Sequence, residues 1–111
     1  MMTDDKLAYI FDGLTNQNIG FDSQTISHFS PEEFEMVIDR CAEQAIVICG
    51  VEVFCHEDGL ATLLEVEINP CEFNSYAWAH LIARSYLAKP GIAISATYSD
   101  PENGHKYALI T

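Results

Sequence analysis

The residues best suited to chemistry in this sequence are two cysteines and two histidines. Cys55 and His56 are adjacent, and Cys71 and His80 follow further along the chain. Structural zinc sites typically use closely spaced pairs of ligands, and these four residues contain no such CxxC-like pair. We therefore predict no metal site and expect the thiols to be buried as small apolar side chains.

Catalysis by these residues also lacks a suitable arrangement. A cysteine nucleophile needs a base and an orienting group, but Cys55 and His56 would point to opposite faces of a strand. Glu52 and Glu65 come close in the hairpin predicted below, yet catalytic carboxylate pairs normally lie in concave clefts with shifted pKa values. The sequence has no glycine-rich phosphate loop, nucleophile elbow or HExxH motif. We predict a protein that is not an enzyme and has no cofactor; an enzyme that uses His56 or His80 is a third alternative.

The elements that position these residues follow from apolar periodicity and capping residues. Apolar residues from Leu7 to Leu14 recur at helical spacing. The segment "SPEEFEMVIDRCAEQ" begins with Ser30 as N-cap, Pro31 at the first helical position and Glu33 as the capping-box acid. A third helix is predicted from the cap Asn69 to about residue 87, and two strands follow it.

Residues 51–68 predict a β-hairpin that turns at Asp58-Gly59, a pair that readily takes positive φ. A regular register from this turn pairs Phe54 with Leu63, Glu52 with Glu65 and Gly50 with Glu67. Three glutamates, Glu52, Glu65 and Glu67, would then share one open face of the sheet. Carboxylates opposite each other repel, so this arrangement needs an explanation.

The order of these elements predicts an α+β fold. We expect one domain over residues 1–111, with an antiparallel sheet of about four strands in two hairpins and two to three helices packed on one face. The composition is 49% apolar and 11% aromatic, which is typical of a globular protein. A fold of this length has an expected radius of gyration of about 13 Å.

The charge is far from balanced. Seventeen acidic residues stand against five basic ones, giving a formal net charge of −12. Nucleic acid and anionic membranes attract basic proteins, so neither is an expected partner, whereas a cationic protein is. The N-terminal sequence "MMTDDKLAYIF" has no secretory pattern, and no apolar run reaches membrane-spanning length, so we expect a cytoplasmic protein with reduced cysteines.

The acidic residues predict a binding surface rather than only a solvated sheet face. Solvated faces normally mix both signs, yet no lysine or arginine falls between residues 41 and 83. Apolar residues on the same predicted face would act as anchors beside complementary charge. The predicted partner-binding set is Glu52, Phe54, Glu57, Asp58, Leu63, Glu65, Glu67, Asp100 and Glu102.

The segment "ISHFSPEEFEMVIDRCAEQAIVICGVEVF", residues 26–54, resembles immunity proteins of bacterial polymorphic toxin systems, including contact-dependent growth inhibition. The resemblance rests on a helix that opens with an "SPEEFE"-like phrase and runs into a "GVEVF"-like strand. It implies a cytoplasmic antidote without enzymatic activity that binds one cognate toxin domain, often a nuclease. The acidity fits a basic nuclease toxin, with an RNase favoured. The resemblance implies no particular site residues.

The main alternative is a small regulatory or scaffold domain that self-associates. The helix predicted after Asn69 carries a wide apolar arc that includes Trp78 and Tyr86. An apolar arc left exposed after folding would form a homodimer contact. The oligomeric state in solution distinguishes the two alternatives.

Overall fold

The computed structural model describes residues 4–18, 26–69, 75–100 and 105–107, and all structural statements refer to these. Three helices and four strands occur in this part of the chain. In chain order they are α1 (Asp4–Phe11), α2 (Pro31–Glu43), β1 (Val47–Glu57), β2 (Leu60–Ile68), α3 (Ser75–Ser85), β3 (Ile92–Asp100) and β4 (His105–Tyr107). The predicted cap of the third helix includes Pro70 and Glu72, which lie outside the described residues.

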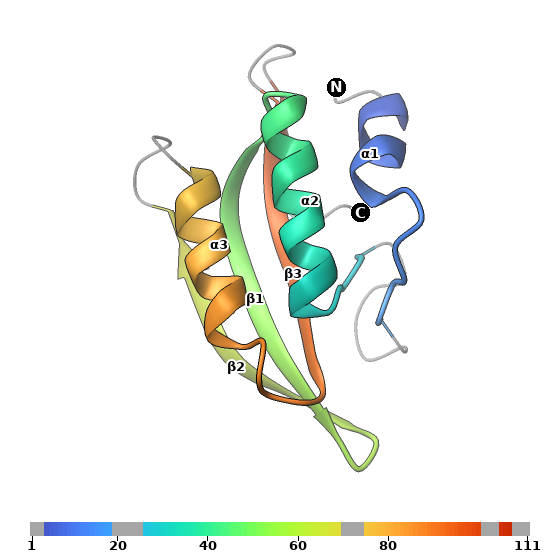
Figure 1. Ribbon diagram of the computed structural model, residues 1–111, viewed down its shortest axis with the longest axis vertical. Coiled ribbons are helices and arrows are strands. Elements are labelled where there is room, and N and C mark those ends of the chain that lie inside the picture. The colour runs from blue at the N-terminus through green and yellow to red at the C-terminus, as the bar shows by residue number, and fades with distance from the viewer. Residues whose placement is uncertain (1–3, 19–25, 70–74, 101–104, 108–111) are drawn as a thin grey trace.

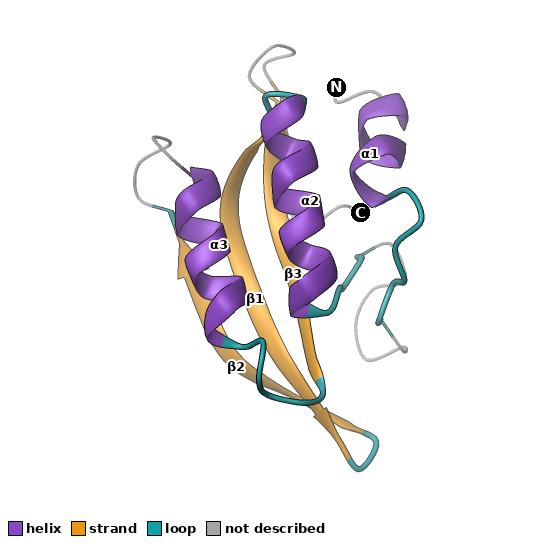
Figure 2. Ribbon diagram, viewed as in Figure 1, coloured by secondary structure: helices purple, strands orange, loops and turns teal. Residues whose placement is uncertain are grey.

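The strands form one antiparallel sheet in the order β2-β1-β3-β4. Helices α2 and α3 cover one face of this sheet, and α1 lies beside α2 (Figures 1 and 2). The α+β class is therefore confirmed. The predicted strand number is matched only roughly, because three long strands are joined by a β4 of three residues. The radius of gyration is 13.1 Å, as expected for this length.

Helix α2 begins where its capping residues predict. The Ser30 hydroxyl accepts a hydrogen bond from the Glu33 backbone N–H at 3.3 Å, which satisfies one of the free donors of the first turn. The Glu33 carboxylate does not complete a reciprocal box. It accepts instead from the backbone N–H of Thr15, at 3.2 Å and 3.4 Å for its two oxygens. This bond ties the segment after α1 to the start of α2.

The core lies between α2, α3 and the helix-covered face of the sheet. One face of α2 supplies a buried apolar stripe, as the sequence predicts. The Phe29 backbone pairs with Ile94 of β3 through two hydrogen bonds of 2.8 Å and 2.7 Å, so the segment before α2 also closes one side of the core. The largest fully buried side chains are Tyr98, Phe29, Phe34, Ile10, Ile38, Ile46, Ile48, Ile94, His28, Val37 and Val51.

The β1–β2 hairpin turns at the predicted residues and then departs from the predicted register. Asp58 and Gly59 have φ values of 51° and 79°, as a two-residue turn with positive φ requires. The predicted pairing holds from the turn as far as Phe54 opposite Leu63. The register then shifts by one residue, with Glu65 opposite Val53, so Leu64 is an extra residue in a β-bulge.

The bulge inverts the faces of the second half of β2. Glu65 and Glu67 pair with Val53 and Val51, which are buried under the helices, so both glutamates lie on the helix face of the sheet. Glu52 alternates with those valines and lies on the opposite, outer face. The prediction that three glutamates share one open face is therefore wrong. A one-residue bulge exchanges the faces of all residues that follow it.

Candidate binding surface

Glu65 and Glu67 lie at the margin of the helix face, beside α3. The hydroxyl of Tyr86, the residue that follows α3, donates a hydrogen bond to Glu65 Oε1 at 2.6 Å. This bond raises the pKa of Tyr86 to about 12, with further contributions from burial and from the charges of Glu65 and Glu67. Because Glu65 holds this phenol, Glu65 and Glu67 lie on the same side of the sheet as the helices, whereas Glu52 lies on the other side.

The outer face near β2 is mostly apolar. Glu52 of β1 lies there opposite Val66, and Phe54 lies opposite Leu63, as predicted for Phe54 and Leu63. The Phe54 ring also contacts the buried His28 ring, with centroids 5.1 Å apart. Three β2 side chains on this face form what we name the apolar row: Leu63, Val66 and Ile68, exposed by 48%, 50% and 74%. The regular register predicted from the turn puts Val66 on the opposite face of the sheet from Glu52, so it does not predict this row.

A shallow groove of about 300 Å³ adjoins the apolar row. It runs across β2, β1 and β3, and its lining includes Gly50, Val66, Ile68 and Thr97. Gly50 has no side chain to fill the space between its neighbours. A Cβ atom at this position would meet its nearest atom, the Glu67 carbonyl oxygen, at 3.5 Å, which is an ordinary contact. A larger side chain at position 50 would therefore fill the groove without a clash at its Cβ.

The remaining predicted residues divide between the hairpin tip and the core. Glu57 and Asp58 are exposed at the tip, as expected. Asp100 was expected in an exposed loop, but β3 continues to this residue and buries it completely. Lys6 of α1 donates to its two carboxylate oxygens at 3.3 Å and 3.2 Å. Asp100 is therefore a buried ion-pair partner and not a surface residue, and Glu102 lies outside the described residues.

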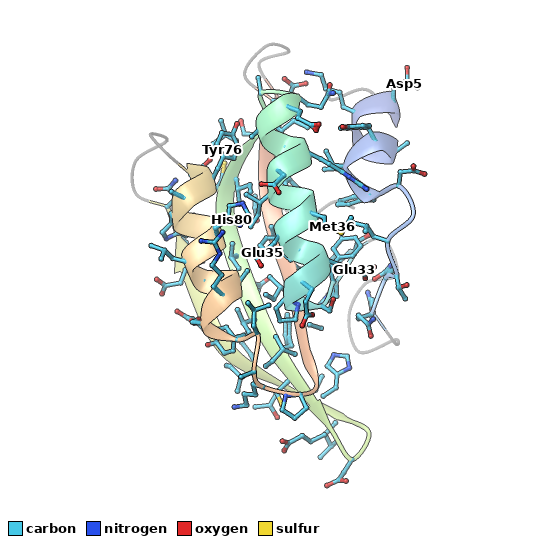
Figure 3. The ribbon with its side chains drawn as sticks, in the orientation of Figure 1. Asp5, Glu33, Glu35, Met36, Tyr76 and His80 are labelled. Atoms are coloured by element: carbon cyan, nitrogen blue, oxygen red, sulfur yellow. The ribbon has the colours of Figure 1, made fainter. Side chains whose placement is uncertain are left out.

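Helices α2 and α3 are joined by charged side chains that sequence reasoning did not connect. His80 has its Nδ1 atom 3.0 Å from Glu35 Oε1 and its Nε2 atom 2.9 Å from Asp39 Oδ1. Arg84 donates through Nε to the same Glu35 oxygen at 2.8 Å. Figure 3 shows His80 and Glu35 facing each other across the two helices. The sequence does contain a sign of this contact. Glu35 and Asp39 lie four residues apart on one helix, and His80 and Arg84 lie four residues apart on the other, so each pair lies on one face of its helix.

Arg40 is also used within the chain. Arg40 donates to the Asp12 carbonyl at 2.7 Å and lies over the Tyr9 ring at 5.9 Å. Tyr9 in turn donates to Glu43, and this hydrogen bond raises the pKa of the Tyr9 phenol. Lys89 is exposed, and no contact of its side chain is observed in the described part of the chain. Few cations therefore remain at the described surface to balance its acids.

The cysteines and histidines of the sequence are dispersed. Cys41, Cys49 and Cys55 take part in no disulfide, and Cys71 lies outside the described residues. Burial raises the pKa of the Cys41 thiol, which makes it a poor nucleophile. Among the described residues, no group of three or more histidine, cysteine, aspartate and glutamate side chains is placed to hold a metal ion.

None of the helices in the described part of the chain is both long and apolar enough to span a membrane. Comparison of the chain with protein-family models, with curated proteins and with solved structures finds no match.

Proposed function

We propose that this protein is a non-catalytic antidote that binds and neutralises a basic toxin domain. The observation that carries the proposal is the imbalance of charge: seventeen acids against five bases. Lys6 and Arg84 pair with acids of the chain itself, and Arg40 bonds to backbone carbonyls. After all five bases are counted, an excess of twelve negative charges remains, and this excess favours a cationic partner.

A nuclease is the class of toxin that this charge fits best. Nucleases hold phosphate with lysine and arginine side chains, and carboxylates can occupy the same positions. A ribonuclease is favoured, in keeping with the resemblance of residues 26–54 to immunity proteins. Such binding would take place in the cytoplasm of the producing cell and would require no catalytic residue or cofactor in the antidote.

Self-association has less support from the packing. Trp78 and Tyr86, which suggested a dimer contact in the sequence, are half-buried and pack against the core. Leu81 is the large apolar side chain that α3 leaves exposed, at 69%. Mass measurement in solution tests this alternative, which requires a stable homodimer that forms through α3.

The test of the proposed function begins at the gene. We expect the neighbouring upstream gene to encode a large secreted protein with a basic C-terminal domain. Expression of that domain alone should arrest growth, and co-expression of this protein should restore it. The purified pair should form a stoichiometric complex that weakens as salt is added, because screening reduces attraction between opposite charges. Failure of the folded protein to restore growth would contradict the proposal.

A further inference from the structure

The edge of the sheet formed by β2 has the properties of a strand-docking site. β2 is the terminal strand in the order β2-β1-β3-β4, and none of the described residues pairs with its outer edge (Figure 1). An edge strand presents backbone N–H and C=O groups on which another strand can form a ladder. β2 is nine residues long and contains no proline, so each of its residues keeps a backbone N–H. The bulge at Leu64 interrupts this edge, and residues 65–68 form a regular segment beyond it.

The two faces of β2 offer different side chains to an added strand. The apolar row of Leu63, Val66 and Ile68 lies on the outer face, with exposures from 48% to 74%. Glu65 and Glu67 lie on the helix face, where their pairing with buried valines of β1 places them. An added strand alternates its side chains in the same way. Over residues 65–68, beyond the bulge, it would therefore meet Val66 and Ile68 on one face and the two carboxylates on the other.

The glutamates decide between a second copy of this chain and a different partner. Consider two copies of this chain whose residues 65–67 pair in an antiparallel ladder with the same face of each sheet aligned. Glu65 of one copy then lies opposite Glu67 of the other. Opposed like charges destabilise a sheet, and each copy also carries a net charge of −12. A strand with lysine or arginine at alternate positions forms favourable cross-strand pairs instead. The charge of β2 therefore selects a cationic strand.

We propose that β2 binds, by strand addition, an extended segment of the basic partner in which apolar and basic residues alternate. The proposal rests on the proposed function for the charge of that partner, and it adds where and how the contact forms. Backbone hydrogen bonds supply the contact along residues 65–68 of β2, Val66 and Ile68 of the apolar row cover the partner's apolar side chains, and Glu65 and Glu67 pair with its cations.

The first test uses a defined probe with the whole, unmodified protein. An acetylated peptide that alternates lysine with valine should bind along residues 65–68, beyond the bulge, and protect the amides of this part of β2 from hydrogen exchange. The same peptide with N-methylated backbone amides on its pairing edge retains charge and apolar side chains but cannot form the ladder. We expect it to lose binding. Equal binding of the two peptides, or protection elsewhere, would overturn the proposal.

Variants of the protein locate the contact. Glu67→Lys replaces a favourable pair by a repulsive one and should weaken peptide binding about fivefold. Glu32→Lys makes the same change of charge at an exposed position of α2, away from β2, and should have an effect of less than about twofold. Equal effects of the two substitutions would overturn the proposal, because they would show that net charge alone governs binding.

Gly50→Val fills the groove on the outer face and leaves the edge of β2 unchanged. We expect peptide binding to be retained in this variant. Loss of binding in a folded Gly50→Val protein would place the peptide in the groove and overturn strand addition.

The toxin experiment separates this inference from the proposed function. Neutralisation of the toxin that is unaffected by Glu67→Lys would reject β2 as the contact and leave the antidote function intact. Strand addition by the peptide without neutralisation of the toxin would support the site and reject the antidote function.

Discussion

The hydrogen bond between Tyr86 and Glu65 gives a direct test of the bulged register. With Leu64 as an extra residue, Glu65 reaches the Tyr86 hydroxyl at 2.6 Å. In a regular hairpin, Glu65 would lie on the outer face, with the sheet between it and α3. A double-mutant cycle with Tyr86→Phe and Glu65→Ala, which removes the acceptor, therefore distinguishes the two registers, because only the bulged register brings the two side chains together.

The expected coupling free energy is about 1 kcal/mol. A hydrogen bond to a charged group contributes about 1.5–3 kcal/mol when it is well shielded, but solvent screening lowers the contribution of a partly exposed pair. Urea denaturation of the four proteins of the cycle measures this coupling. Glu67→Ala combined with Tyr86→Phe is a matched control, since Glu67 acts on the phenol only through its charge, and we expect a smaller coupling there. A coupling at Glu65 below about 0.3 kcal/mol would refute the bulged register.

The same bond predicts how stability depends on pH. The pKa of Tyr86 is about 12 in the folded protein, against an ordinary value of 10.0. The neutral phenol is the form that donates to Glu65. The contribution of this bond to the free energy of unfolding is therefore complete below pH 10. It is lost as the pH rises through about 12, because the Tyr86 phenol ionises at a lower pH in the unfolded chain than in the folded protein. When phenolate absorbance is followed as the pH rises, the Tyr86→Phe protein should lack one tyrosine that ionises near pH 12 in the unmodified protein. Ionisation of Tyr86 near the ordinary value would refute the contact.

Two further predictions concern the stability of the fold and are measured by thermal and urea denaturation. Lys6→Met removes the ammonium that pairs with the fully buried Asp100 and should cost about 3 kcal/mol, or on the order of 10 °C in Tm. The exposed Lys89→Met should cost less than about 0.5 kcal/mol, and equal effects of the two substitutions would contradict the ion pair. Gly91→Ala should destabilise the protein more than Gly13→Ala. Both glycines have positive φ, but only at Gly91 would a Cβ lie 2.7 Å from a backbone carbonyl oxygen of β1. The opposite order of stability would contradict this packing.

Local chemistry made part of the fold predictable. The N-cap of α2 depends on the hydroxyl of Ser30 and the fixed φ of Pro31, and both act within a single turn of helix. The turn at Asp58-Gly59 depends on residues that tolerate positive φ. Neither feature needs information from distant parts of the chain, and both are found where the sequence places them.

The register of β2 was not predictable because neither of its faces is fully buried. Every residue of β2 is exposed or half-exposed. Hydrophobic pattern specifies register only where one face is buried, so the alternation in "LATLLEVEI" did not determine which residues face the helices. The adjacent leucines at 63 and 64 are the one local sign of a break in the period of two. Similarly, the burial of Asp100 depends on Lys6, which is 94 residues away in sequence.

The bulge changes what the acidity of this protein can do. If all three glutamates shared the outer face, one patch would provide both the attraction and the contact. In the structure, the engaged basic residues leave a negative field around the whole chain, while the contact groups of β2 are divided between an apolar face and an acidic face. Fields of this kind act over roughly 10 Å at 0.1 M salt and chiefly affect the rate of association. A backbone ladder acts only on contact and chiefly affects dissociation. Salt should therefore change the association rate of a basic partner, and N-methylation of its docking strand should change the dissociation rate, each with little effect on the other.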